Sequence, residues 1–160
     1  MYYLIPIGIL EYMLHFSAKE EYGVLAILAL SLHSGHGPLQ VKSIAQRGRI
    51  PVRFLEQVMN LLKKRGLVES VRGPHGGYLL TKPPDQIRLG EVLQAVEGPL
   101  IALEPASSRK GTREVENRIL KEVWDQAHSS LEAFLNSISF KDLCERKKEL
   151  EGKPVLMFHI

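Results

Sequence analysis

The chain of 160 residues contains a single cysteine, Cys144. One thiol cannot build an internal disulfide framework or a cysteine-rich metal site, and it fits the reducing cytoplasm. The apolar start MYYLIPIGIL lacks the basic residues of a signal peptide, is followed by Glu11, and falls short of the ~20 apolar residues needed to span a bilayer. We therefore expect a cytoplasmic protein with no membrane partner.

The sequence also lacks the residue sets that carry common enzyme chemistry. No Ser-His-Asp set or paired carboxylate is visible. The Gly-rich stretch RGPHGG lacks the Lys and the following helix of a phosphate-binding loop. His33 and His36 have no Cys, Asp or Glu close by to complete a zinc site, so we place them in a surface loop. The prediction is no enzyme, no metal and no cofactor.

What is present is an uneven distribution of charge. The length and the 44% hydrophobic content allow one core, with room for a helical appendage. The net charge is only +3. Residues 39–82, however, hold nine Lys and Arg against two acids, a net +7, whereas the remainder holds twelve basic and sixteen acidic residues, a net −4. A concentrated basic segment of this kind is typical of a nucleic-acid binder.

The same basic segment predicts a helix, a turn, a second helix and a hairpin. Residues 41–48 form a short helix, with Val41, Ile44 and Ala45 inward, and RGRIP forms a turn in which Gly48 takes a positive φ and Pro51 starts the next helix. That helix runs from 51 to about 65 and ends at Gly66. LVESV and GYLLT then alternate as strands around the tip RGPHGG. This order is a winged helix-turn-helix.

The helix from 51 to 65 is the predicted reader of DNA. Its core-facing stripe contains Phe54, Leu55, Val58, Leu61 and Leu62. Long polar side chains lie opposite, and such groups can pair with bases in a major groove, although an ordinary solvated face has the same pattern. The wing tip carries an arginine and a histidine, and an arginine on such a tip can enter a narrow minor groove. These predicted contacts are Arg53, Glu56, Gln57, Asn60, Lys63 and Lys64 on the helix and Arg72 and His75 on the wing.

Three further residues outside that helix are candidates for phosphate contacts. Lys19 and Tyr22 lie near the start of a helix that begins at Ser17 with a capping box and ends before Gly35, although solvent exposure explains Tyr22 equally well. Lys42 lies near the start of the short helix.

Two further helices are predicted from apolar residues at helical spacing. The helix that begins at Ser17 repeats Leu25, Leu28, Ala29 and Leu32, and a later helix, from 89 to 96, packs Leu89, Val92, Leu93 and Val96 inward. Residues 1–16 are either an extension or a real element packed on the core.

The longest periodic segment, from 113 to about 138, predicts a dimerisation helix. At ~1.5 Å per residue it is longer than the winged core needs for cover. Its surplus apolar face is expected to meet the same helix of a second copy, with folding onto its own domain as the alternative. The predicted dimer residues are Ile119, Leu120, Val123, Trp124, Ala127, Leu131 and Phe134. Residues 139–160 are expected to form a charged, then apolar, C-terminal tail, either docked as a strand or partly ordered, with Cys144 as a small buried residue.

Four separated motifs carry a family resemblance. SAKEEYG, IPVRFLEQV, LVESVRGPHGGYLL and IRLGEVLQAVEGPL occur in the order found in the IscR/NsrR/CymR-type bacterial transcription regulators, which this chain resembles. The resemblance implies a homodimer on operator DNA, with the helix of Glu56 and Gln57 in the major groove and Arg72 in the minor groove. Sensor members hold an iron-sulfur cluster through three cysteines in the loop after this last motif. Here that loop, IALEPASSRKGTR, has none.

The sequence therefore predicts a mainly α fold with a small β-hairpin wing. The expected units are an extension over 1–16, a winged helix-turn-helix over 17–99, a loop over 100–112, a dimerisation helix over 113–138 and the tail over 139–160. The expected partners are double-stranded DNA, a second copy of the chain and an unidentified small-molecule or protein effector. The alternative is a winged-helix module that regulates through a protein partner. The Arg and Gly residues at the wing tip argue against this alternative, because a protein interface favours aromatic anchors there.

Overall fold

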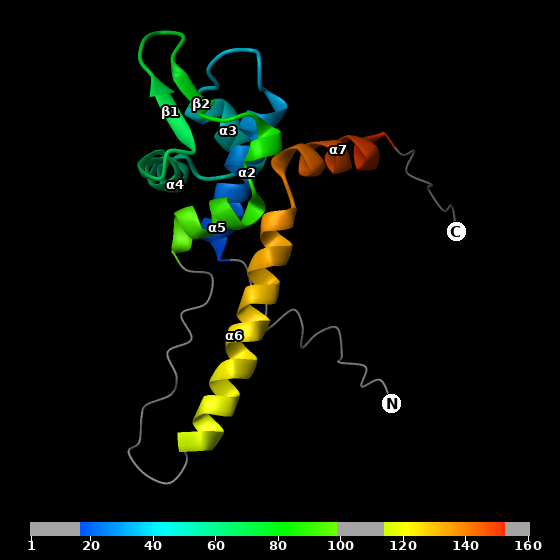
Figure 1. Ribbon diagram of the computed structural model, residues 1–160. Helices are drawn as coiled ribbons and strands as arrows, with labels where there is room; N and C mark the ends of the chain where they lie inside the picture. Colours follow the sequence, from blue (N-terminus) through cyan, green and yellow to red (C-terminus); the bar gives the residue numbers. More distant parts are fainter. Residues whose placement is uncertain (1–16, 99–113, 153–160) are drawn as a thin grey trace, which may run out of the picture.

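A computed structural model describes residues 17–98 and 114–152 of the chain. The described elements confirm the predicted fold class, because helices predominate and one antiparallel hairpin forms the wing (Figure 1). In chain order they are α2 (Ala18–Leu32), α3 (Val41–Gly48), α4 (Val52–Lys64), β1 (Val68–Val71), β2 (Gly77–Leu80), the 3-10 turn η1 (Pro84–Gln86), α5 (Leu89–Glu97), α6 (Glu114–Ser137) and α7 (Phe140–Glu151).

Helix α2 is the centre of the core and packs against α3, α4, α5 and α7. It begins with the predicted capping box, in which the Glu20 N–H donates to Ser17 Oγ at 3.1 Å and the Ser17 N–H donates to the Glu20 carboxylate at 2.7 Å. The predicted stripe was wrong in part: Leu25, Leu28 and Leu32 are only half-buried. The buried side of α2 consists instead of Gly23, Ala26, Ile27, Ala29, Leu30 and Ser31. At Gly23 the helix approaches α5 closely, since an added Cβ would lie 2.7 Å from Val96 Cγ2.

The helix-turn-helix joins α3 and α4 through a left-handed residue. That residue is Arg49, at φ 52°, and not the predicted Gly48. Gly48 is the last residue of α3, where an added Cβ would lie 2.7 Å from Ile50 Cδ1, so it is needed for close packing. Ile50 is buried and its N–H donates to the Ala45 carbonyl at 2.9 Å. Pro51 occupies the N-cap position, so α4 begins at Val52, one residue later than predicted.

Helix α4 buries a stripe that differs from the predicted one at its two edges. Leu55, Val58 and Leu62 are buried as expected. Met59 is fully buried, whereas Phe54 is 57% exposed. Phe54 belongs to the first turn of α4 and lies at the edge of the buried stripe.

The wing is a two-stranded antiparallel hairpin in which Val68 pairs with Leu80 and Val71 with Gly77. Leu39 adds a short bridge to β2, because the Leu39 N–H donates to the Tyr78 carbonyl at 3.0 Å and the Leu39 carbonyl accepts from the Tyr78 N–H at 2.9 Å. A Cβ at Gly77 would collide with the Leu39 carbonyl oxygen. This close approach requires glycine at position 77.

Helices α6 and α7 complete the described chain. The end of α6 docks on α5, where Gln94 Nε2 donates to the Glu132 carboxylate at 2.9 Å and Leu135 is buried. Helix α7 begins with a second capping box and inserts Phe140, which has no exposed surface, into the core. The sequence prediction of a tail from 139 missed this helix; residues 153–160 lie outside the described residues. In the parts of the chain that are described, no helix is long and apolar enough to cross a membrane.

Candidate nucleic-acid interface

The predicted reading face of α4 is exposed along its whole length. Four of its side chains, Arg53, Glu56, Gln57 and Asn60, follow one another from the first turn to the middle of the helix, and all are exposed. The buried stripe lies on the opposite side and attaches the helix to α2, α3 and α5. The core therefore holds α4 from behind and leaves a row of hydrogen-bonding groups free to meet a ligand.

One of the predicted phosphate contacts also connects α4 to the wing. Lys63 Nζ donates to Ser70 Oγ on β1 at 2.6 Å, in an exposed contact. Ser70 was not predicted as part of the site, and its sequence neighbours, Glu69 and Val71, give no signal that it meets Lys63. Lys64, the next residue, is exposed. The pair places positive charge where the helix meets the hairpin.

The wing tip is exposed and attached to the start of α3. Arg72 and His75 are both exposed and lie on the turn that the Gly76 N–H closes by donating to the Gly73 carbonyl at 3.0 Å. Gln40 Nε2 approaches the Pro74 carbonyl at 3.5 Å. The hairpin extends beyond the helices of the core (Figure 1). Arg72 thus sits on a projecting tip whose base and turn are both held.

Two of the basic residues outside α4 already have acidic partners. Lys19 Nζ lies 3.0 Å from the carboxylate of Glu97 at the end of α5, and its hydrogen bond lowers the pKa of Glu97 below the usual value. Lys82 Nζ lies 2.6 Å from the Glu91 carboxylate. A phosphate that bound either lysine would have to compete with the carboxylate already paired with it. Tyr22 is half-buried against the core, and Lys42 is exposed at the start of α3.

The predicted dimer helix carries an exposed apolar face. Val115, Ile119, Leu120, Val123, Trp124 and Phe134 are each more than half exposed. Ala127 is exposed and Leu131 is half-buried. Figure 1 shows α6 running away from the winged core, so that only its last turns dock there. This surface is larger and more apolar than scattered exposed side chains produce.

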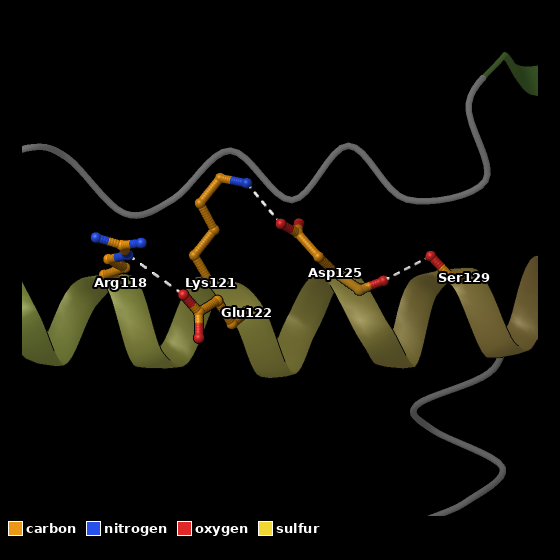
Figure 2. A network of polar contacts seen from close by, with 5 residues as sticks. All are labelled: Arg118, Lys121, Glu122, Asp125 and Ser129. Atoms are coloured by element: carbon orange, nitrogen blue, oxygen red, sulfur yellow. Dashed lines mark hydrogen bonds and ion pairs between the residues drawn. The ribbon is translucent and has the colours of Figure 1, made fainter.

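The opposite face of α6 is charged and satisfied within the helix (Figure 2). Arg118 Nε lies 3.3 Å from the Glu122 carboxylate, and Lys121 Nζ lies 2.6 Å from the Asp125 carboxylate. Ser129 Oγ donates to the Asp125 carbonyl at 2.9 Å. At 100° per residue, these groups centre almost opposite Val123. Helix α6 is therefore two-faced, and its described contacts with Gly90 and Gln94 of α5 involve Glu132, Leu135 and Asn136 near its end.

The donor set does not fit a cysteine-ligated iron-sulfur cluster. Cys144, the only cysteine in the sequence, is buried in α7, and burial raises the pKa of its thiol. The loop where sensor relatives place their cysteines falls in 99–113, outside the described residues, but its sequence supplies no thiol. Within the described ranges no group of three His, Cys, Asp or Glu residues converges on a metal-sized site.

A family model described as an iron-dependent transcriptional regulator, Rrf2, matches residues 16–146. The chain belongs to the Rrf2 family. Over 135 residues it is 36% identical to the HTH-type transcriptional regulator IscR of Pectobacterium carotovorum, a match that spans 84% of this chain and 82% of that protein. It is also 33% identical to CymR of Bacillus subtilis over 127 residues, which is 79% of this chain and 87% of CymR.

Solved structures of Rrf2 relatives have the same fold. An IscR from T. potens superposes with a TM-score of 0.71 at 34% identity and covers 92% of this chain and 98% of that one. CymR, titled the global cysteine regulator of B. subtilis, gives a TM-score of 0.70 at 31% identity, over 84% and 98%. The predicted resemblance is confirmed. The protein is an IscR- and CymR-like, DNA-binding transcriptional regulator of the Rrf2 family.

Proposed function

We propose that this Rrf2 protein binds operator DNA as a homodimer, with the first turns of α4 in the major groove and Arg72 in the minor groove. The observation that carries the proposal is the continuous exposed polar face of α4 beside a projecting, anchored wing tip. The alternative of a protein-interaction module gains no support at the tip, where Arg72, Pro74 and His75 are exposed and no Phe, Tyr or Trp is among them.

The side chains of α4 suit base edges in a defined way. Arg53 can donate twice to guanine, Gln57 and Asn60 can pair with adenine, and Glu56 can accept from the cytosine amino group. Lys42, Lys63 and Lys64 lie at element ends, where cations meet phosphates. His75 adds a second polar group at the wing tip. This division assigns base reading to the first half of α4 and affinity to the lysines.

A second copy of the chain is proposed to cover the apolar face of α6. Side chains such as Val123 and Trp124 are more than half exposed in the single chain, and burying them against identical side chains would gain about 25 cal/mol per Å² of apolar surface. The helix is about 36 Å long at ~1.5 Å per residue, which allows several turns of contact. Two such chains would present two α4 helices and two wings to pseudo-palindromic DNA.

The wing provides the test of this proposal. Arg72→Ala should weaken binding to a selected operator duplex about tenfold or more, because a charge-assisted contact to DNA is lost. Its melting temperature and its dimer should stay unchanged, since the side chain is exposed. Arg118→Ala, which removes an arginine from the charged face of α6, is the matched control and should bind normally. Unchanged affinity of Arg72→Ala in a band-shift titration would remove the wing from the mechanism.

A further inference from the structure

Phe54 is an exposed aromatic side chain on the helix proposed to read DNA. It is 57% exposed in the first turn of α4, although the periodicity of the helix predicted it to be buried. Its neighbours in the turn, Arg53 and Gln57, are polar and exposed. An apolar ring of this size held in water among charged groups forgoes the stabilisation that burial would give. Within residues 17–98 and 114–152, Phe54 does not belong to the core cluster.

The position of Phe54 on the helix is defined. At 100° per residue it lies between the buried stripe and the polar face, on the flank shared with Gln57. The other flank holds Glu56 and Lys63, and Lys63 contacts the wing. Phe54 therefore marks the side of α4 that faces away from the hairpin, next to one of the side chains assigned to base reading.

The major groove offers one kind of apolar group, the C5-methyl of thymine. A side chain that enters the groove beside Arg53 and Gln57 and carries only carbon atoms can gain affinity there by covering that methyl. We propose that Phe54 is a specificity-determining residue that packs against a thymine methyl in each half-site. The inference rests on the proposed placement of α4 in the major groove and adds the base that this flank selects.

The surroundings of Phe54 favour DNA over a protein partner. The basic segment around it includes Arg49, Arg53 and Lys42, which suit a polyanion. Val52, the other exposed apolar residue of this turn, points to the opposite flank, so the two do not form a continuous patch. A protein hot spot is instead a cluster of apolar side chains that exclude water together.

The test uses a duplex obtained by binding-site selection with the full-length protein. Each thymine is replaced in turn by uracil, which removes only the C5-methyl, and affinity is measured by band shift. Wild type should lose about fourfold for one thymine per half-site, the value of burying one methyl-sized group. Phe54→Ala should bind the thymine-containing and the uracil-substituted duplexes equally. The motif that it selects should lose the A·T preference at the base pair to which wild type is sensitive. Val52→Ala is the control and should keep the wild-type sensitivity.

Several results would overturn the inference while leaving the proposed function intact. If wild type binds the selected duplex in a salt-sensitive way but no uracil changes its affinity, Phe54 does not read a methyl. The same follows if Phe54→Ala keeps the wild-type pattern of sensitivity. A change in the oligomeric state of Phe54→Ala, measured by light scattering without DNA, would assign the ring to a protein contact. Failure of wild type to select any duplex would count against the proposed function itself.

Discussion

Glu56 is the only acidic side chain on α4 and lies among residues that should approach a polyanion. A carboxylate near phosphates is repelled, so its presence is explained best by a specific donor such as the cytosine amino group. Glu56→Ala should therefore change the selected base at one position more than it changes overall affinity. Binding-site selection checks this, with Glu69→Ala on the outer side of β1 as control. Recovery of the wild-type motif by Glu56→Ala would contradict the assignment.

Two residues show where sequence periodicity stops being informative. Arg49 adopts the left-handed conformation and Gly48 does not, because α3 continues through Gly48 and the turn falls one residue later than predicted. Phe54 fits the apolar repeat of α4 yet is exposed, because periodicity gives the direction of a side chain but not how far the core extends along a helix. Both differences lie within the predicted DNA-binding segment.

At the scale of the element, α7 depends on its capping box. Ser139 Oγ accepts from the Asp142 N–H at 3.2 Å and donates to the Asp142 carboxylate at 2.6 Å. Ser139→Ala should lower the free energy of unfolding by about 1 kcal/mol, because the first turn loses its cap. Urea unfolding measures this, and Ser130→Ala, which removes an exposed hydroxyl within α6, should have little effect. A loss no larger than that of Ser130→Ala would show that the cap does not stabilise α7.

The same cap predicts a dependence on pH. Hydrogen bonds from the Ser139 side chain and then its backbone hold the pKa of Asp142 below the usual value in the folded protein. A carboxyl with a lowered folded pKa stabilises the fold above its unfolded pKa, and that contribution disappears as the pH falls through the folded pKa. Urea unfolding as a function of acid pH should therefore show a steeper loss for wild type than for Asp142→Asn. Parallel curves would contradict this.

The sequence contains a signal for the start of α7, but the charged composition of the residues that follow masks it. Ser139 and Asp142 have the spacing of a capping box, but the following ERKKELE is so charged that it resembles a solvated end. Only a narrow side of the helix, with Phe140 and Cys144, is buried. A short apolar stripe of this kind is too weak to be detected by periodicity alone. The wide apolar stripe of α6, in contrast, predicted the bounds of that helix to within one residue at each end.

The apolar face of α6 gives a prediction about assembly. Val123→Glu should convert the proposed dimer to a monomer, because two carboxylates would be brought together in an apolar interface. Ser129→Glu, on the charged face of the same helix, should leave the assembly unchanged. Sedimentation velocity at micromolar concentration separates the two outcomes. A Val123→Glu protein that sediments like wild type would show that this face is not the contact between copies.

At the scale of the whole molecule, the order of elements and the placement of charge could be predicted from one sequence. The winged core follows from local signals: two caps, two apolar periods and a glycine-rich turn. The exposed apolar face of α6 could be predicted only as surplus length, because the sequence of one chain does not show what covers that face. The loop after α5 contains no cysteine, so it cannot hold a cluster through three cysteines of its own.

The dimeric DNA-binding mechanism is tested most directly by measuring affinity for a selected duplex as a function of salt concentration. The number of chains bound per duplex is measured in the same samples. In the proposed dimer, two copies of Lys42, Lys63 and Lys64 would make about six phosphate contacts, so log K should fall against log salt with a slope of about −5. Two chains should bind each pseudo-palindromic duplex, and Arg72→Ala should reduce affinity. Binding that is insensitive to salt, or one chain per duplex, would contradict the dimeric DNA-binding mechanism.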